Sequence, residues 1–126
     1  MQHHLFEYAV IRYVPRVERE EFLNIGVILF CAKEKFLGLE YILDEDRILS
    51  FSTSANTLEL REYLCAMEQI CKGDVDAGVI GKFDIASRFR WLTATRSTII
   101  QTSKVHPGLC ENANETLKNL FNSLVL

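Results

Sequence analysis

The chain has 126 residues, of which 48% are hydrophobic and 25% are charged, with only two prolines and six glycines. This length and composition predict one folded domain over residues 1–126 and exclude an intrinsically disordered chain. The longest apolar run is less than half of the roughly 20 residues that a membrane-spanning helix needs. The N-terminus also lacks a basic segment followed by an apolar one, so we expect a cytoplasmic protein that does not bind a membrane.

The formal net charge of −3 is distributed unevenly along the chain. Residues 82–106 contain five basic side chains and one acidic one, a net charge of +4, which leaves −7 on the remaining residues. This contrast is the main electrostatic indication of a binding surface.

The first part of the chain has the pattern of three strands. β-Branched and aromatic residues alternate from Leu5 to Val14, which predicts a strand that ends before Pro15. The segment from Phe22 to Ala32 is apolar on both faces, which is typical of a central strand buried on two sides. Its Gly26 predicts a bulge or a close backbone approach. Phe36 to Leu43 alternates well enough to complete an antiparallel hairpin.

Helical spacing of apolar residues then predicts a helix over residues 57–72. Asn56 and Glu59 form a pair of the capping-box type at its start, and Gly73 ends it. A second strong helical stripe closes the chain, introduced by Asn112.

Two shorter helical segments are expected after Asp44 and Asp84, because an aspartate before a helix can cap it. Residues 73–81 hold three glycines and predict an irregular connection, and the β-favouring residues 97–103 predict a further strand. The fold class is therefore α+β, with a mainly antiparallel sheet of about four strands packed with two or three helices.

The cysteines and the adjacent histidines form no metal or redox motif. There is no CxxC pair and no paired histidine spacing, so we expect buried free thiols, no metal and no cofactor. His3 and His4 are expected to be solvated, because neighbouring strand residues point to opposite faces. The four cysteines are Cys31, Cys65, Cys71 and Cys110.

Arg12 is a charge on a strand face whose other members are apolar, so it requires a partner. Glu20 or Glu21 can supply one, and the ion pair would then hold the following loop to the sheet. The alternative is an arginine directed at an anionic ligand. Asn24 begins the most buried strand beside Gly26, where its amide either satisfies backbone groups or hydrogen-bonds a ligand.

Basic and aromatic residues are interleaved over residues 87–108, a pattern similar to that of sites for phosphates or single-stranded nucleic acid. The pI near 5.6 lacks the broad basic surface of a dedicated nucleic-acid binder. His106 has no nucleophile nearby in sequence, so a structural role is favoured, with a spatial partner such as Cys31 or Glu21 left open. The candidate anion-binding residues are Arg88, Arg90, Arg96 and Lys104.

Three stretches resemble the bacterial family called domain of unknown function 3037 over nearly the full chain: YAVIRYVPRVEREEFLNIGVILF, FRWLTATRSTIIQTSKVHPGL and ETLKNLFNSLV. In that family the connection after the first strand typically reads arginine, glycine, glutamate, phenylalanine. Here Arg19, Glu21 and Phe22 match, and Glu20 replaces the glycine. The motif residues implied by the resemblance are Arg12, Pro15, Glu21, Asn24, Gly26, Arg96, Gln101 and His106.

The resemblance implies a small cytoplasmic protein without an established activity. It also implies a partner, such as the kinase-like proteins of toxin–antitoxin type whose genes lie beside genes of this family. We therefore expect a non-catalytic interaction or regulatory module, and the absence of nucleophile, metal and phosphate-loop motifs agrees with this. The candidate polar site is Arg12, Glu21, Asn24, Arg96, Gln101 and His106.

Two alternatives remain open from the sequence. One is a small enzyme or binder that holds a phosphorylated ligand between Arg12, Arg96 and His106, which requires these side chains to converge in one pocket. The other is nucleic-acid binding through residues 88–104, with an affinity that falls steeply with salt. The sequence leaves open whether the protein is an enzyme and whether it forms homo-oligomers.

Overall fold

The computed structural model describes residues 3–94 and 98–126. Within them, five strands form one antiparallel sheet with the order β3-β2-β1-β4, and β5 also pairs with β1. β4 and β5 follow one another along the same edge of β1, because they pair with residues 11–13 and 4–8 respectively. The strands are β1 (His4–Tyr13), β2 (Leu23–Cys31), β3 (Phe36–Tyr41), β4 (Ile100–Thr102) and β5 (His106–Cys110).

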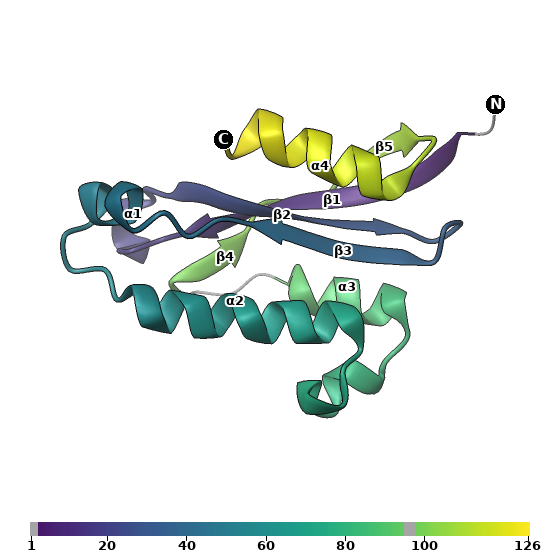
Figure 1. Ribbon diagram of the computed structural model, residues 1–126, viewed down its shortest axis with the longest axis horizontal. Coiled ribbons are helices and arrows are strands. Elements are labelled where there is room, and N and C mark those ends of the chain that lie inside the picture. The colour runs from purple at the N-terminus through teal and green to yellow at the C-terminus, as the bar shows by residue number, and fades with distance from the viewer. Residues whose placement is uncertain (1–2, 95–97) are drawn as a thin grey trace.

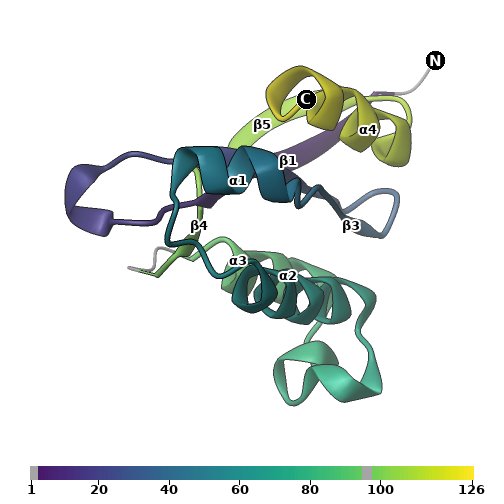
Figure 2. The same cartoon turned by 60° about the vertical axis from the view of Figure 1, so that its left-hand side comes forward.

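Helices cover both faces of this sheet, so the fold is α+β, as the sequence predicts. In Figure 1, α2 and α3 lie below the sheet and α4 lies above it; Figure 2 shows α1 at one end of the sheet. No helix in the described residues is long and apolar enough to cross a membrane. The helices are α1 (Glu45–Phe51), α2 (Thr57–Lys72), α3 (Ile85–Leu92) and α4 (Ala113–Leu124).

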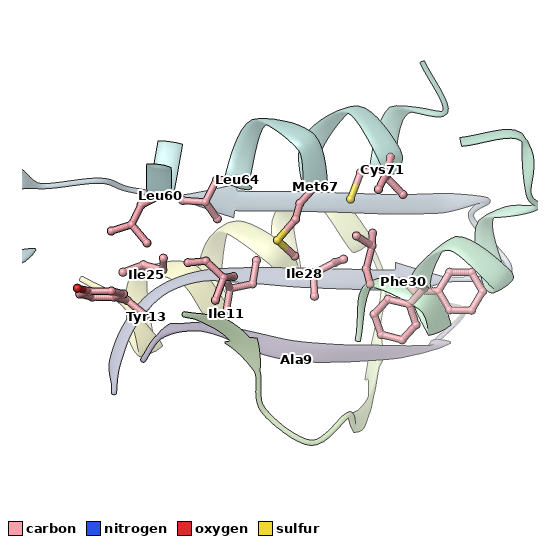
Figure 3. Packing of buried hydrophobic residues seen from close by; sticks show 14 of the residues in the cluster. Ala9, Ile11, Tyr13, Ile25, Ile28, Phe30, Leu60, Leu64, Met67 and Cys71 are labelled. Atoms are coloured by element: carbon pink, nitrogen blue, oxygen red, sulfur yellow. The ribbon is translucent and has the colours of Figure 1, made fainter. Parts of the chain in front are cut away.

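β2 is buried on both sides, as its continuous apolar sequence predicts. Ile28 and Phe30 belong to the core layer that contains α2 and α3, whereas Val27, Leu29 and Cys31 belong to the layer that contains α4. Figure 3 shows the first layer, in which side chains of β1 and β2 meet those of α2. Since full burial of a large aliphatic side chain contributes about 1.5–3 kcal/mol, these two layers supply most of the driving force for folding.

All four helices begin after a side chain that caps them, as predicted. Each capping oxygen accepts a hydrogen bond from the amide three residues on, which satisfies an amide that has no partner within the helix. α2 has the predicted bounds, and Gly73 ends it with a left-handed backbone at φ 66°. The capping residues are Asp44, Asn56, Asp84 and Asn112.

No strand is predicted from the sequence for residues 106–110, which form β5. Pro107 is tolerated in β5 because this strand pairs with β1 at the edge of the sheet, where a missing amide hydrogen is harmless. Gly108 lets the ring of Phe6 lie against the backbone, since a Cβ there would be only 2.5 Å from the ring. Local sequence patterns do not reveal this long-range pairing.

Two other predicted segments are partly revised. β4 is shorter than the predicted strand over residues 97–103, whose first residue lies outside the described residues. The irregular connection predicted over residues 73–81 contains two short 3-10 turns, Val75–Ala77 and Ile80–Lys82.

Candidate functional site

A row of polar residues crosses three neighbouring strands near the end of β1. Arg12 of β1 lies directly opposite Asn24 of β2 on one side and Gln101 of β4 on the other. Directly paired residues of antiparallel strands project from the same face of the sheet. The fold therefore brings together three of the candidate polar residues, although about 90 positions separate Gln101 from Arg12 in the sequence.

A β-bulge in β2 determines which residue faces Arg12. Ile11 pairs with Gly26, but Arg12 pairs with Asn24, so Ile25 is the additional residue. The bulge reverses the alternation of β2 and lets Ile25 enter the core on the α2 side. Gly26 is required here, because a Cβ would lie 2.8 Å from the Glu40 carbonyl oxygen and collide with β3. Both predictions for this glycine, a bulge and a close backbone approach, are confirmed.

Arg12 has no ion pair among the described residues, so neither Glu20 nor Glu21 is the expected partner. Its guanidinium instead lies over the ring of Phe22, 3.9 Å from the centroid, and its Nε is buried without a hydrogen-bond partner. Glu21 is paired with Arg19. The expected ion pair therefore does not explain why an arginine occupies position 12 of the sheet.

An open pocket of about 290 Å³ lies beside Arg12. Gln101 and Glu21 line it together with Arg12, so three of the candidate polar residues share one cavity. The amide of Gln101 donates to the Thr98 carbonyl oxygen at 2.9 Å, which fixes that side chain. Arg12 is the cation of this pocket, and Glu20 adds a second carboxylate to its lining.

Asn24 holds the end of α4. Its Nδ2 donates to the carbonyl oxygen of Leu124 at 3.2 Å, and Arg47 of α1 donates to the next carbonyl, that of Val125, at 2.8 Å. Carbonyls at a helix end have no partner within the helix, so these contacts stabilise it. The Oδ1 of Asn24 is buried and has no hydrogen-bond partner. The side-chain amide of Asn24 therefore satisfies one backbone carbonyl through Nδ2, and its Oδ1 is not used in this way.

His106 lies apart from this pocket. It pairs with Tyr8, with ring centroids 5.4 Å apart, and Tyr8 precedes Arg12 by four residues, about 13 Å along a strand. No hydrogen bond or ion pair joins His106 to Cys31 or Glu21 in the described part of the chain. Arg96 lies outside the described residues.

Arg88 is a buried structural residue. Its side chain donates to the carbonyl oxygens of Ile70 and Cys71, both at 2.9 Å, and of Phe83 at 3.0 Å. A cation at the C-terminal end of a helix is favoured by the helix dipole. Arg88 therefore links the end of α2 to α3. It follows Ile70 and Cys71 by 18 and 17 residues in the sequence.

The other two candidate anion-binding residues that the structure describes, Arg90 and Lys104, lie on the surface. Arg90 makes two hydrogen bonds to the carboxylate of Glu7, at 2.7 and 2.9 Å, and these bonds raise the pKa of Arg90. Lys104 is exposed. Two of the predicted anion-binding residues, Arg88 and Arg90, thus already make hydrogen bonds within the chain.

A second hollow lies between α2 and α3 and was not indicated by any sequence motif. It has a volume of about 430 Å³, and its lining is mainly apolar. The α2 residues that line it recur every three or four positions, so they share one side of that helix. The lining residues are Glu59, Glu62, Tyr63, Ala66, Met67, Ile70 and Trp91. We call this hollow the α2–α3 groove.

Three of the four cysteines are buried, and Cys65 is exposed. Burial raises the pKa of the Cys71 thiol to about 12. Cys31 and Cys110 lie near the carboxylate of Glu34, and each Sγ is 3.8 Å from its Oε2. Nδ1 of His4 is 3.1 Å from the same oxygen. No sequence motif indicates this cluster, because its residues come from three segments that are far apart in the chain.

These observations define a class of protein: a small α+β protein whose sheet has helices on both faces and a polar row at the end of β1. The chain belongs to the family described as Protein of unknown function (DUF3037), whose family model matches residues 8–125. The resemblance inferred from three stretches of sequence is thereby confirmed. No curated protein and no solved structure matches the chain.

Proposed function

We propose that the protein is a non-catalytic interaction module that docks a partner protein in the α2–α3 groove. The observation that carries this proposal is an open, mainly apolar hollow of about 430 Å³. Trp91, 39% exposed, lies on its α3 side, and Met67 and Ile70 lie on its α2 side. Tryptophan is enriched among the residues that contribute most to protein–protein binding, because it buries a large rigid surface.

The charges of the groove indicate what its occupant offers. Glu59 and Glu62 line the groove, and no ion pair involves either carboxylate in the described residues. The complementary partner is a segment with a large apolar side chain flanked by lysine or arginine. The kinase-like protein implied by the family resemblance is our proposed source of that segment.

A cytoplasmic location is part of the same proposal. All four cysteines are free thiols in the structure. Free thiols persist in the reducing cytosol, whereas disulfides form and persist in oxidising compartments. The location can be checked by fractionating cells that express the chain at its natural level.

The groove is tested by co-expressing the chain with a kinase-like protein of the toxin–antitoxin type and measuring affinity by calorimetry. Ala66→Glu places a charge on an exposed helix position that lines the groove, and Trp91→Ala removes the anchor. We expect each variant to weaken binding at least tenfold, about 1.4 kcal/mol. Leu109→Ser, on the exposed side of β5, is the matched control. If the wild type forms no complex, the kinase-like protein is not the partner. If Ala66→Glu binds with unchanged affinity, the partner does not dock in the α2–α3 groove.

A second candidate function, binding of an anionic ligand, is favoured by one observation at Arg12. The Nε atom of Arg12 is buried and unpartnered beside a pocket that Gln101 also lines. A phosphate or carboxylate oxygen there would supply the missing acceptor. Calorimetric titration with inorganic phosphate, with Arg12→Met as the comparison, tests this. Equal heats for both proteins would remove this candidate.

The nucleic-acid alternative has less support. Arg88 and Arg90 make hydrogen bonds within the chain, so neither guanidinium is available without breaking them. We expect no single-stranded DNA or RNA binding at physiological salt. Binding that weakens steeply between low and high salt would instead favour this function.

A further inference from the structure

We propose that His4, Cys31, Glu34 and Cys110 form a binding site for a thiophilic divalent cation, with Zn²⁺ as the first candidate. The ligand atoms of His4, Cys31 and Glu34 all lie within 4.8 Å of one another. Oε2 of Glu34 lies 3.1 Å from Nδ1 of His4 and 3.8 Å from Sγ of Cys31. Sγ of Cys110 is also 3.8 Å from this oxygen.

His4, Cys31 and Glu34 are close enough to be three ligands of one ion, and Cys110, beside Glu34, is the candidate fourth. Bonds from zinc to nitrogen, oxygen and sulfur are about 2.0–2.3 Å long, which places the ligand atoms of a tetrahedral site about 3.3–3.8 Å apart. The distances measured from Glu34 Oε2 lie at or near this range. One imidazole, one carboxylate and two thiolates are all groups that bind zinc, and the thiolates disfavour Mg²⁺ and Ca²⁺.

The fold holds these four side chains in fixed positions. His4 and Cys110 lie directly opposite each other on β1 and β5, and Cys31 is the last residue of β2. Glu34 lies in the turn between β2 and β3, and its carboxylate accepts the amide of Ala113 at the start of α4 at 3.1 Å. A backbone donor to a ligating carboxylate is the type of outer contact that orients metal ligands.

Helix capping by itself explains only part of this arrangement. Glu34 accepts the Ala113 amide and so adds to the Asn112 cap of α4, but this contact does not require an imidazole and two thiols beside the same carboxylate.

The site is accessible to an ion from solvent. The side chains of His4 and Glu34 are 22% and 25% exposed, whereas Cys31 and Cys110 are buried beneath them. An ion therefore meets the imidazole and the carboxylate first and the thiols next. This arrangement provides the entry path that a metal site needs.

The test uses the full chain, stripped of metal with a chelator and then titrated with Co²⁺ and Zn²⁺. We expect one ion per chain, and the Co²⁺ form should show thiolate-to-metal charge transfer with the intense visible bands of a tetrahedral site. Competition with a chromogenic chelator gives the Zn²⁺ affinity. Weak Co²⁺ binding without charge transfer, or no stoichiometric Zn²⁺ binding, would overturn the proposal.

Variants distinguish a metal site from a helix cap. Glu34→Gln retains an oxygen that can accept the Ala113 amide but removes the anionic ligand, and His4→Gln changes a partly exposed position. Each should lower the Zn²⁺ affinity at least about tenfold and leave the circular dichroism spectrum unchanged. Cys110→Ser should weaken the charge-transfer band without abolishing it, because the Cys31 thiolate remains. Cys65→Ser is the matched control, since Cys65 is exposed and lies on α2; an equal loss there would refute the assignment.

Discussion

Arg12 and Asn24 lie directly opposite each other on β1 and β2, and each has a buried polar atom, Nε and Oδ1 respectively, without a hydrogen-bond partner among the described residues. Buried polar atoms are almost always hydrogen-bonded, and an unsatisfied one costs about 1–3 kcal/mol. A donor and an acceptor left unpaired on neighbouring strands are therefore unfavourable for the isolated protein. Of the two, Arg12 also lines the neighbouring pocket.

Arg12→Met should change the free energy of unfolding by less than about 1 kcal/mol, because methionine keeps the packing on Phe22 and removes the unsatisfied donor. Asn24→Ala should cost about 1 kcal/mol more than this, because the carbonyl of Leu124 loses its donor. Urea unfolding of both variants measures the difference. A loss of 3 kcal/mol in Arg12→Met would show that Arg12 is mainly structural.

Arg88→Met should destabilise the protein by about 2–3 kcal/mol, because two buried carbonyl oxygens and one partly buried one lose a charged donor. Arg90→Met is the matched control, since Arg90 makes an exposed ion pair with Glu7, and such pairs contribute about 0.2–1 kcal/mol. Chemical unfolding of the two variants under identical conditions gives the comparison. Equal losses would contradict the structural role assigned to Arg88.

Glu34 should make the protein sensitive to acid. Hydrogen bonds from the Ala113 amide and from His4 lower the pKa of Glu34 below its ordinary value of 4.5. A carboxyl whose pKa is lower in the folded state stabilises the protein above the unfolded-state pKa. This stabilisation is lost as the pH falls below about 4.5 towards the folded-state value. Thermal unfolding from pH 7 to pH 3, with a chelator present, should show a smaller loss of stability in Glu34→Gln than in the wild type.

The thiols should differ in reactivity. Cys65 is exposed, whereas burial raises the pKa of Cys71 to about 12. At pH 8 only about one Cys71 in ten thousand would be a thiolate, the form that reacts. A chromogenic disulfide reagent should therefore modify one cysteine rapidly in the native, metal-free protein and all four in urea. Cys65→Ser should abolish the rapid phase, and its persistence would contradict the burial of the other thiols.

The sequence by itself determined the local structure: which segments form strands and helices, and where the helices begin. Hydrophobic periodicity gave three strands and the long helices, since burial imposes a period of two on strands and 3.6 on helices. The capping residues Asp44, Asn56, Asp84 and Asn112 gave the helix starts because a cap acts within three residues. Gly26 was interpreted correctly because a glycine in a buried strand indicates a bulge or a close approach.

Pairing between distant segments was decided only by the tertiary structure. Pro107 and Gly108 have the local pattern of a turn, and their place in β5 depends on the backbone and the Phe6 ring of β1. The surroundings of Arg12 depend on strand register, which one bulge shifts, and on a loop that brings Phe22 rather than a glutamate to the guanidinium. The cluster of His4, Cys31, Glu34 and Cys110 joins segments more than 100 residues apart, so no local spacing could reveal it.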